Sequence, residues 1–471
     1  MIGRSKEKDI LRRCMESDSP EFLVVYGRRR VGKTYLIKEF FNEHFAFYAT
    51  GLDGGKTREQ LKAFNTALRE YGCSEKKIPE DWFEAFLRLK ELLKASTSHR
   101  DSISKKKIVF LDELPWMSTA RSDFKRALDY FWNSWGSTQN DLLLIVCGSA
   151  TSWIIDNILD DKGGFYNRIT RQIHLMPFSL GECEAFLKER GHILTRSQIM
   201  ETYMYFGGIP YYLRLLDERL TPAQNVYELV IKESGSLHYE YDRLFGSLFK
   251  HSDRHLAIIE ALKEKRGGIK RVELAANEKI GDGEPLTKAL NELLQCGFIR
   301  KYSDFTKEKQ GFFYQITDPF VLFMQNIRRG VISGSWTSYI NTPGYYAWRG
   351  NAFETLCLNH IDKIKSELGI SGVESNEFAW RSREKKKGVQ IDLIIDRRDD
   401  VIDICEMKFT NDEFEVDGKY EEELYHKIEV FQKETNNRKA VHLILVSANG
   451  LKRNSHSAVF LNQLDKEALF K

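Results

Sequence analysis

A glycine-containing loop between a strand-like and a helix-like segment is the feature that most limits the fold of this chain. The segment VVYGRRRVGKTYLI follows the pattern G-x4-G-K-[S/T], directly after the apolar run 22–26. In this pattern backbone N–H groups surround phosphate oxygens, and the helix that follows adds positive potential. We predict that Lys33 reaches the β- and γ-phosphates and that the Thr34 hydroxyl binds Mg²⁺. The predicted phosphate-binding loop consists of Gly27, Arg28, Arg29, Arg30, Val31, Gly32, Lys33 and Thr34.

Two adjacent acidic residues are the partner that such a loop requires. Asp112 and Glu113 end the apolar run 108–111. We predict that Asp112 holds Mg²⁺, usually through water, and that Glu113 orients and deprotonates the attacking water. Taken alone, the pair is better explained as the exposed end of a strand. The loop upstream favours the functional interpretation.

Short apolar runs alternate with segments of helical spacing over residues 1–235. The runs at 22–26, 45–49, 108–111, 142–147 and 171–175 have the length of buried strands. This alternation predicts an α/β domain with a mostly parallel sheet. The polar stretch 96–107 is expected to be a surface loop before the third strand.

Three residues near the last two of these runs are candidates for contacts with phosphate. Ser149 follows the run 142–147, where its hydroxyl would sense the γ-phosphate, and the alternative is a helix N-cap. Arg168 and Arg171 are candidates for an arginine that neutralises charge in the transition state. Each would act either in its own chain or in a neighbouring one.

Six segments of this half occur in the order found in one family of P-loop NTPases. They resemble the archaeal-type AAA-related ATPases, and they read IGRSKEKDIL, YGRRRVGKT, LDELPWM, GSATSWI, NRITRQIHLMPFSLGE and FGGIPYYL. The resemblance implies ATP and Mg²⁺ as ligands, and a glutamate that acts beside the Mg²⁺ aspartate. It also implies that residues 2–4 border the adenine and that residues 207–210 begin a helical lid. In this family a winged helix and a nuclease-like domain commonly follow.

Residues 250–320 change to three short helical segments followed by two strand-like runs. Three helices and a β-hairpin predict a winged-helix domain. Its third helix has few basic residues, whereas the hairpin carries Lys301, Lys307 and Lys309. Phosphate contacts with DNA and a packing role that couples the neighbouring domains both stay open.

A charged hairpin is the main feature of residues 345–471. The segment VQIDLIIDRRDDVIDICEMKF places Asp392 on one apolar run and Glu406 and Lys408 on the next. Strand alternation puts Glu406 and Lys408 on the same side. Two acids that share Mg²⁺, with a lysine beside them, are what a restriction-type nuclease site needs. The alternative is a hairpin with charges on its solvated face.

The arrangement resembles the PD-(D/E)xK superfamily, specifically the nuclease-like domain that follows these ATPases. The resemblance implies a restriction-endonuclease-like α/β fold and a site for Mg²⁺, or for Mn²⁺. The implied metal ligands are Glu354, Asp392 and Glu406, with Glu406 and Lys408 as catalytic residues. Lys427 and Gln432, on a helical segment downstream, are implied as candidates for an auxiliary polar residue.

The chain of 471 residues is therefore expected to contain three domains, at 1–235, 250–320 and 345–471. Its net charge of +3 gives no global affinity for nucleic acid, so a DNA partner needs a local basic patch. Scattered cysteines and short apolar runs predict a cytoplasmic protein without membrane contact. We expect ATP hydrolysis to gate a nuclease-like domain that acts on DNA. The alternative is an ATP-driven switch that binds a protein partner or DNA through an inactive C-terminal domain.

Overall fold

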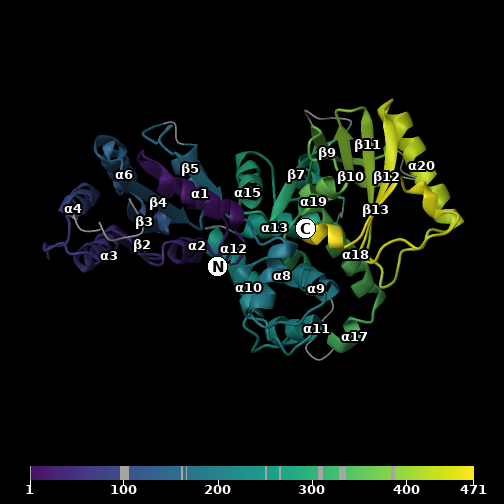
Figure 1. Ribbon diagram of the computed structural model, residues 1–471, viewed down its shortest axis with the longest axis horizontal. Helices are drawn as coiled ribbons and strands as arrows, with labels where there is room; N and C mark the ends of the chain where they lie inside the picture. The colour runs from purple at the N-terminus through teal and green to yellow at the C-terminus, as the bar shows by residue number, and fades with distance from the viewer. Residues whose placement is uncertain are drawn as a thin grey trace. The chain divides into compact units, whose positions relative to one another are not determined.

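The structure is a computed structural model, and it describes residues 2–95, 106–160, 163–165, 167–249, 252–264, 267–305, 311–327, 336–382 and 388–471. It divides into two compact units, residues 1–176 and 177–471, which we name the N-terminal unit and the C-terminal unit. Figure 1 shows the elements of each unit. None of the described helices is long and apolar enough to cross a membrane.

A five-stranded parallel sheet forms the centre of the N-terminal unit, in the order β2-β3-β4-β1-β5 (Figure 1). The strands are β1 (Glu21–Tyr26), β2 (Phe47–Thr50), β3 (Lys107–Asp112), β4 (Leu142–Gly148) and β5 (Arg171–His174). The helices are α1 (Ser5–Glu16), α2 (Lys33–Phe40), α3 (Thr57–Glu70), α4 (Trp82–Ala95), α5 (Leu114–Met117), α6 (Phe124–Ser134) and α7 (Thr151–Ile154), with the short helical turns η1 (Gly136–Thr138) and η2 (Ile155–Leu159). The five predicted strands are confirmed, with limits that shift by at most two residues.

Helices cover the sheet because its central strands are apolar on both faces. Every residue of β1 and of β4 is buried, which requires packing on both sides. One face, which includes Val24 and Leu111, shares a core with α3, α4 and α6. Of the predicted loop 96–107, residues 96–105 lie outside the described residues, and β3 begins at Lys107.

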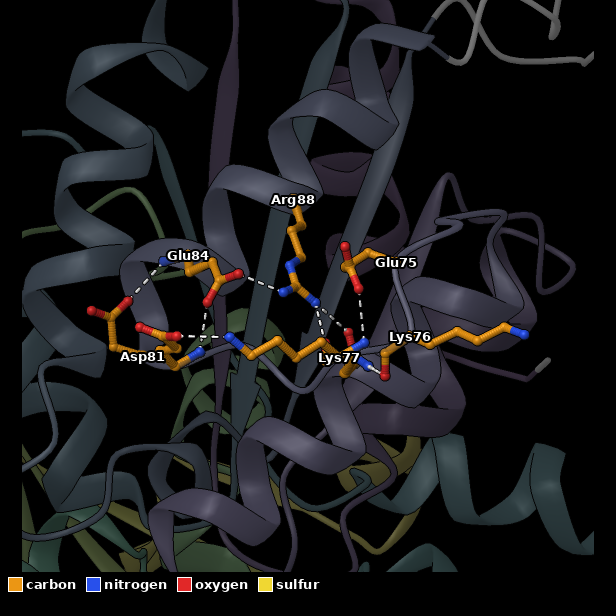
Figure 2. Close-up of polar contacts among 8 residues, drawn as sticks. Glu75, Lys76, Lys77, Asp81, Glu84 and Arg88 are labelled. Carbon is orange, nitrogen blue, oxygen red and sulfur yellow. Dashed lines mark hydrogen bonds and ion pairs between the residues drawn. The ribbon is translucent and has the colours of Figure 1, made fainter.

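The Arg88 side chain holds the connection between α3 and α4 (Figure 2). Its Nη1 donates to Asn65 Oδ1 at 3.0 Å and to the Lys77 carbonyl, and its Nη2 donates to Glu84. Asn65 is buried on α3. These contacts therefore join the segment before α4 to both helices, and they keep α3 and α4 together as one cover of the sheet.

An eight-stranded mixed sheet is the largest feature of the C-terminal unit, in the order β13-β12-β11-β10-β9-β7-β8-β6 (Figure 1). The strands are β6 (Ile269–Lys270), β7 (Ile299–Asp304), β8 (Phe312–Ile316), β9 (Ser375–Arg381), β10 (Gln390–Arg397), β11 (Val401–Lys408), β12 (Ala440–Ser447) and β13 (Asn462–Leu464). The helices before the sheet and between its first strands are α8 (Leu180–Glu189), α9 (Arg196–Phe206), α10 (Pro210–Arg214), α11 (Pro222–Val226), η3 (Tyr227–Ile231), α12 (Glu240–Leu248), α13 (Asp253–Glu264), α14 (Arg271–Ala275) and α15 (Glu284–Gln295). The later ones are α16 (Pro319–Ile327), α17 (Trp336–Tyr339), α18 (Pro343–Leu358), α19 (Ile361–Glu367), α20 (Gly418–Thr435), η4 (Ser457–Val459) and α21 (Glu467–Phe470).

The segment 250–320 contains the expected helices and hairpin, but its hairpin belongs to a larger sheet. β7 pairs with β8 in antiparallel fashion, and it also pairs in parallel with β9. Phe305, directly after β7, packs on Phe378 and Phe431. The sheet is thus continuous between 250–320 and 345–471. The division of this region into two domains stays a prediction.

His360 joins two helical parts of the C-terminal unit. Its Nε2 accepts a hydrogen bond from the backbone N–H of Leu180, the first residue of α8, at 3.1 Å. Its Nδ1–H donates to the Leu356 carbonyl at 2.8 Å. Both contacts require the neutral imidazole. Burial lowers the pKa of His360, and the charge of Lys363 acts in the same direction.

We predict that His360→Gln flattens the dependence of stability on pH. The fold disfavours the imidazolium, so the unfolded chain binds more protons and stability is lost as the pH falls below about 6.5. The glutamine amide oxygen can still accept from Leu180, but it does not titrate. The urea midpoint should therefore fall less between about pH 7 and about pH 5 than in the unmodified protein. An equal fall of the urea midpoint in both proteins would contradict the prediction. All other histidines are present in both, so they cannot cause a difference.

Candidate functional site

The loop between β1 and α2 has the backbone that its glycines predict. Gly27 and Gly32 have φ angles of +143° and +91°, in the region that favours glycine. A Cβ on Gly27 would lie 2.4 Å from the carbonyl oxygen of Leu175, so a larger residue does not fit. α2 begins at Lys33, directly after Gly32, and its N-terminus therefore faces the loop.

The Lys33 side chain lies within the loop that it follows. It is buried, and its Nζ donates to the carbonyl oxygens of Gly27 at 2.7 Å and Arg28 at 2.9 Å. The ammonium group is thus placed where the loop curls, as the sequence predicts for a lysine that meets phosphate.

Arg4 ties the N-terminal segment to the loop and to the end of β5. Its Nη1 donates to the Met176 carbonyl at 2.7 Å, and its Nη2 donates to the Val31 carbonyl at 3.2 Å. The side chain is buried. The expectation that residues 2–4 border the adenine stays a prediction, and so does the lid at Gly207–Pro210, where α10 begins.

The order of the strands brings the two predicted acids to the loop. β4 pairs with β1 on one side and with β3 on the other, so these three parallel strands end at the same edge of the sheet. Thr34 Oγ1 donates to Asp112 Oδ2 at 2.7 Å, and Asp112 is buried. A hydroxyl and a carboxylate this close are oxygen ligands of the kind that Mg²⁺ prefers. The residues present therefore fit the predicted ion.

Glu113 and Ser149 are in direct contact. The Ser149 N–H and hydroxyl both donate to Glu113 Oε2, at 3.1 Å and 2.9 Å. Glu113 has φ 46° and ψ 48°, a left-handed conformation that is uncommon outside glycine and recurs at functional sites. Ser149 does not cap α7, whose N-cap residue is Ala150. The sequence placed both residues at strand ends but did not indicate that they touch.

The structure does not bring Arg168 and Arg171 to the loop of their own chain. Arg171 is the first residue of β5, and its guanidinium lies 3.3 Å from Glu21, the first residue of β1. Parallel strands start at the edge opposite the one where they end, so Arg171 lies at the far edge from the loop. Arg168 precedes β5 and is exposed. The prediction that either acts within its own chain is corrected; action in a neighbouring chain stays a prediction.

The C-terminal hairpin has the predicted alternation of side chains. Cys405 and Met407 pack with Ile444 in one core, whereas Ile404 belongs to the core on the other face, under α20. Glu406 contacts residues of α20, so it shares the face of Ile404. This confirms that Glu406 points away from its neighbours Cys405 and Met407.

Glu406 is enclosed by cationic and phenolic groups. Its Oε1 accepts a hydrogen bond from Lys427, and its Oε2 accepts one from the Tyr420 hydroxyl at 3.0 Å. The Nζ of Lys408 lies 3.5 Å from Oε2. Burial by itself raises the pKa of Glu406, but the charges of Lys427 and Lys408 and these hydrogen bonds bring it below its ordinary value. The carboxylate is therefore ionised and already neutralised.

The other two predicted metal ligands are not gathered with Glu406. Asp392 lies one residue beyond the last β10–β11 pair, at a bulge between Ile391 and Ile394 that interrupts the pairing of β10 with β9. Its Oδ1 accepts a hydrogen bond from Gln390 at 2.5 Å. In the part of the chain that the structure describes, no three His, Cys, Asp or Glu side chains form a group that could hold a metal ion. The predicted set of Glu354, Asp392 and Glu406 is thus not assembled in this structure, and lysines contact Glu406 in place of a metal ion.

The hairpin expected to contact DNA makes contacts within the protein. The Lys301 ammonium lies 3.7 Å from the centroid of the Phe312 ring, and β7 is paired on both sides. Lys307 and Lys309 lie outside the described residues. Phosphate contacts with DNA and the packing role therefore both stay predictions.

Residues 1–216 match a protein-family model described as an ATPase domain predominantly from Archaea. An uncharacterized protein of Methanocaldococcus jannaschii is 26% identical over 330 residues, which cover 68% of this chain and 67% of that protein. An uncharacterized ATP-binding protein of the same organism is 44% identical over 39 residues, which are 8% of this chain and 66% of that protein. The matches thus span about two thirds of each relative's own length.

Two solved structures are similar to this chain at low identity. A Walker-type ATPase of Pyrococcus abyssi has 20% identity and a TM-score of 0.48, over 68% of this chain and 95% of that one. The ORC2 protein of Aeropyrum pernix, in ADPNP–ADP complexes, has 15% identity and a TM-score of 0.44, over 69% of this chain and 94% of that one. The family match and the geometry at the loop carry the assignment of function.

We predict that Lys427→Met destabilises the protein. Loss of one partner of a buried ion pair costs about 3–5 kcal/mol when nothing replaces it. Lys408 and Tyr420 remain near Glu406, so we expect about 1–3 kcal/mol in urea unfolding near pH 7. Because the fold lowers the pKa of Glu406 from 4.5, its contribution is present above that value and is lost as the pH falls through the lower folded value. In the variant this loss should begin at a higher pH.

The matched control for this prediction is the double variant Glu406→Gln, Lys427→Met. If the two side chains interact directly, Lys427→Met costs much less when Glu406 is already neutral. If the two substitutions change the free energy of unfolding additively, the direct contact between Glu406 and Lys427 is contradicted.

Proposed function

We propose that the chain hydrolyses ATP at the loop 27–34 together with Asp112 and Glu113, and the match of residues 1–216 to the model of an ATPase domain predominantly from Archaea supports this. The observation that carries the proposal is the 2.7 Å contact between Thr34 Oγ1 and Asp112 Oδ2, with Glu113 next in the chain. It joins the phosphate loop to the acids that hydrolysis requires.

Each residue of the site has a distinct task in this proposal. Lys33 neutralises the β- and γ-phosphates, and Thr34 and Asp112 would hold Mg²⁺, which would supply further positive charge there. Glu113 accepts the proton of the attacking water. Ser149 donates twice to Oε2 of Glu113. This fixes the carboxylate and leaves Oε1 for the water.

We predict that Lys33→Ala and Glu113→Gln both slow hydrolysis by at least about 100-fold, for different reasons. Lys33→Ala removes the cation that binds phosphate, so ATP binding should weaken as well. Glu113→Gln keeps the shape of the side chain but cannot take a proton, so ATP should still bind. Phosphate release and binding of a fluorescent ATP analogue measure the two effects. Arg126→Ala, whose side chain is 82% exposed, is the control with an unchanged rate. A normal rate in Lys33→Ala would contradict the proposal.

We also predict that Ser149 acts through Glu113 rather than on the phosphate. Ser149→Ala should lower kcat about 10-fold with little change in ATP affinity, and Ser149→Thr should restore part of the rate. In a Glu113→Gln background the same substitution should have almost no further effect, because its target has already lost its function. A Ser149→Ala variant that binds ATP less well, with effects additive to Glu113→Gln, would instead indicate a phosphate sensor.

A second candidate function is metal-dependent cleavage of DNA by the C-terminal unit, gated by ATP. It is supported by Glu406 and Lys408, which lie on one face of β11 with 3.5 Å between the ammonium and the carboxylate. The fold would then combine a winged helix with a PD-(D/E)xK-type domain. For Mg²⁺ or Mn²⁺ to bind, Glu406 would have to exchange Lys427 for the ion. If it does not, the unit serves as a binding module for DNA or for a protein partner, switched by ATP.

A cleavage assay separates the two roles of the C-terminal unit. Supercoiled plasmid and linear single- and double-stranded DNA are incubated with Mg²⁺ or Mn²⁺, with and without ATP. The nuclease candidate predicts cleavage that Glu406→Ala abolishes and that Lys33→Ala uncouples from ATP. Absence of cleavage under all these conditions, with ATP hydrolysis intact, would reject it in favour of the switch.

A further inference from the structure

The phosphate loop contains three consecutive arginines, and one of them has distinctive surroundings. Arg28 is buried. The Arg29 guanidinium lies over the ring of Trp116, 5.9 Å from its centroid. Among the described residues, no hydrogen bond or ion pair engages Arg29. Its five N–H donors are thus held in place by an aromatic face and are not used by the protein itself.

Trp116 is fixed relative to the catalytic acids. Its backbone N–H donates to the Glu113 carbonyl at 2.9 Å, in the first turn after β3. A Cβ on Gly51, at the end of β2, would lie 2.9 Å from Trp116 Cβ and 2.6 Å from the Glu113 carbonyl oxygen. This close packing leaves the turn little freedom to shift. The Arg29 guanidinium therefore lies against the turn that begins at Glu113, on the side of the loop where that turn packs.

That side of the loop is where charge develops during hydrolysis. The terminal phosphate must lie between Lys33 and Thr34 on the loop and Asp112 and Glu113 at the end of β3, since these groups are expected to bind it and to activate its water. A guanidinium placed there can donate two parallel hydrogen bonds to phosphate oxygens.

We propose that Arg29 is the arginine that stabilises the terminal phosphate in the transition state of its own chain, and that Trp116 is the positioning residue that aims it. The proposal rests on the ATPase activity proposed above. It fills the role that Arg168 and Arg171 cannot fill within the chain, since both lie at or before the start of β5.

The step itself is an ordinary hydrolysis. The water oxygen forms a bond to the γ-phosphorus while the bond from that phosphorus to the bridging oxygen breaks, and the electron pair of that bond stays on ADP. The proton of the water passes to Glu113 and then to solvent. Arg29 exchanges no proton, because a guanidinium stays charged throughout. It donates hydrogen bonds that strengthen as negative charge spreads over the equatorial oxygens.

The test compares kcat and KM for the unmodified protein and four variants: Arg29→Ala, Arg29→Lys, Trp116→Phe and Arg126→Ala. We expect Arg29→Ala to lower kcat by about 100-fold or more, with KM for ATP changed by less than about 5-fold. Arg29→Lys should recover only part, because an ammonium lacks the bidentate fork. Trp116→Phe keeps an aromatic face and should retain most of the rate. Arg126→Ala, on an exposed part of α6, should match the unmodified protein.

Two further readouts separate a transition-state role from a structural one. Added guanidinium, below denaturing concentrations, should raise the rate of Arg29→Ala but not that of Lys33→Ala. Arg29→Ala should also bind ADP with aluminium fluoride more weakly, while its affinity for ADP alone stays the same. The rate per molecule should not depend on protein concentration, because Arg29 serves its own chain.

The outcomes that overturn the proposal differ from those that overturn the ATPase function. Hydrolysis that is lost in Lys33→Ala but normal in Arg29→Ala rejects only the role of Arg29. Equal weakening of ADP and of ADP with aluminium fluoride rejects it too, in favour of a general binding role. If the unmodified protein shows no hydrolysis that depends on Lys33, both proposals fall.

Discussion

The position of β4 between β1 and β3 is the constraint on which the N-terminal site depends. All three strands are parallel, so the loop after β1, the acids at the end of β3 and Ser149 after β4 meet at one edge of the sheet. Hydrogen bonds then join them, from Thr34 to Asp112 and from Ser149 to Glu113. In another strand order the same residues would be too far apart to act on one phosphate.

A buried carboxylate of the C-terminal unit is paired with charges of the same unit. Glu406 is only 7% exposed, and it stays ionised because Lys427 and Lys408 offset the cost of its burial. The β7–β8 hairpin also makes its contacts within this unit, because its strand β7 pairs with β9. Both features strengthen one continuous sheet. A metal ion that binds Glu406 must first displace a lysine that contacts it.

Local sequence patterns predicted the strands, whereas they did not predict which distant strands pair with each other. All five strands of the N-terminal unit follow from short apolar runs, and the β10–β11 hairpin follows from alternation around a charged turn. The pairing of β7 with β9 joins segments more than 70 residues apart, and no local pattern marks it. Arg171 lies at the edge of the sheet opposite the phosphate loop. This placement depends in the same way on a pairing between distant segments, that of β5 with β1.

The sequence by itself determined the phosphate loop and its acids, because the spacing of Gly27, Gly32 and Lys33 is local and only glycine adopts the backbone at Gly27 without a clash. Only the tertiary structure decided what each charged group touches: that Glu113 is held by Ser149 and that Arg29 lies over Trp116. It also decided that, among the described residues, Glu354, Asp392 and Glu406 do not come together as a metal-binding group. Such contacts act over a few ångströms between residues distant in the chain, so sheet order and register set them.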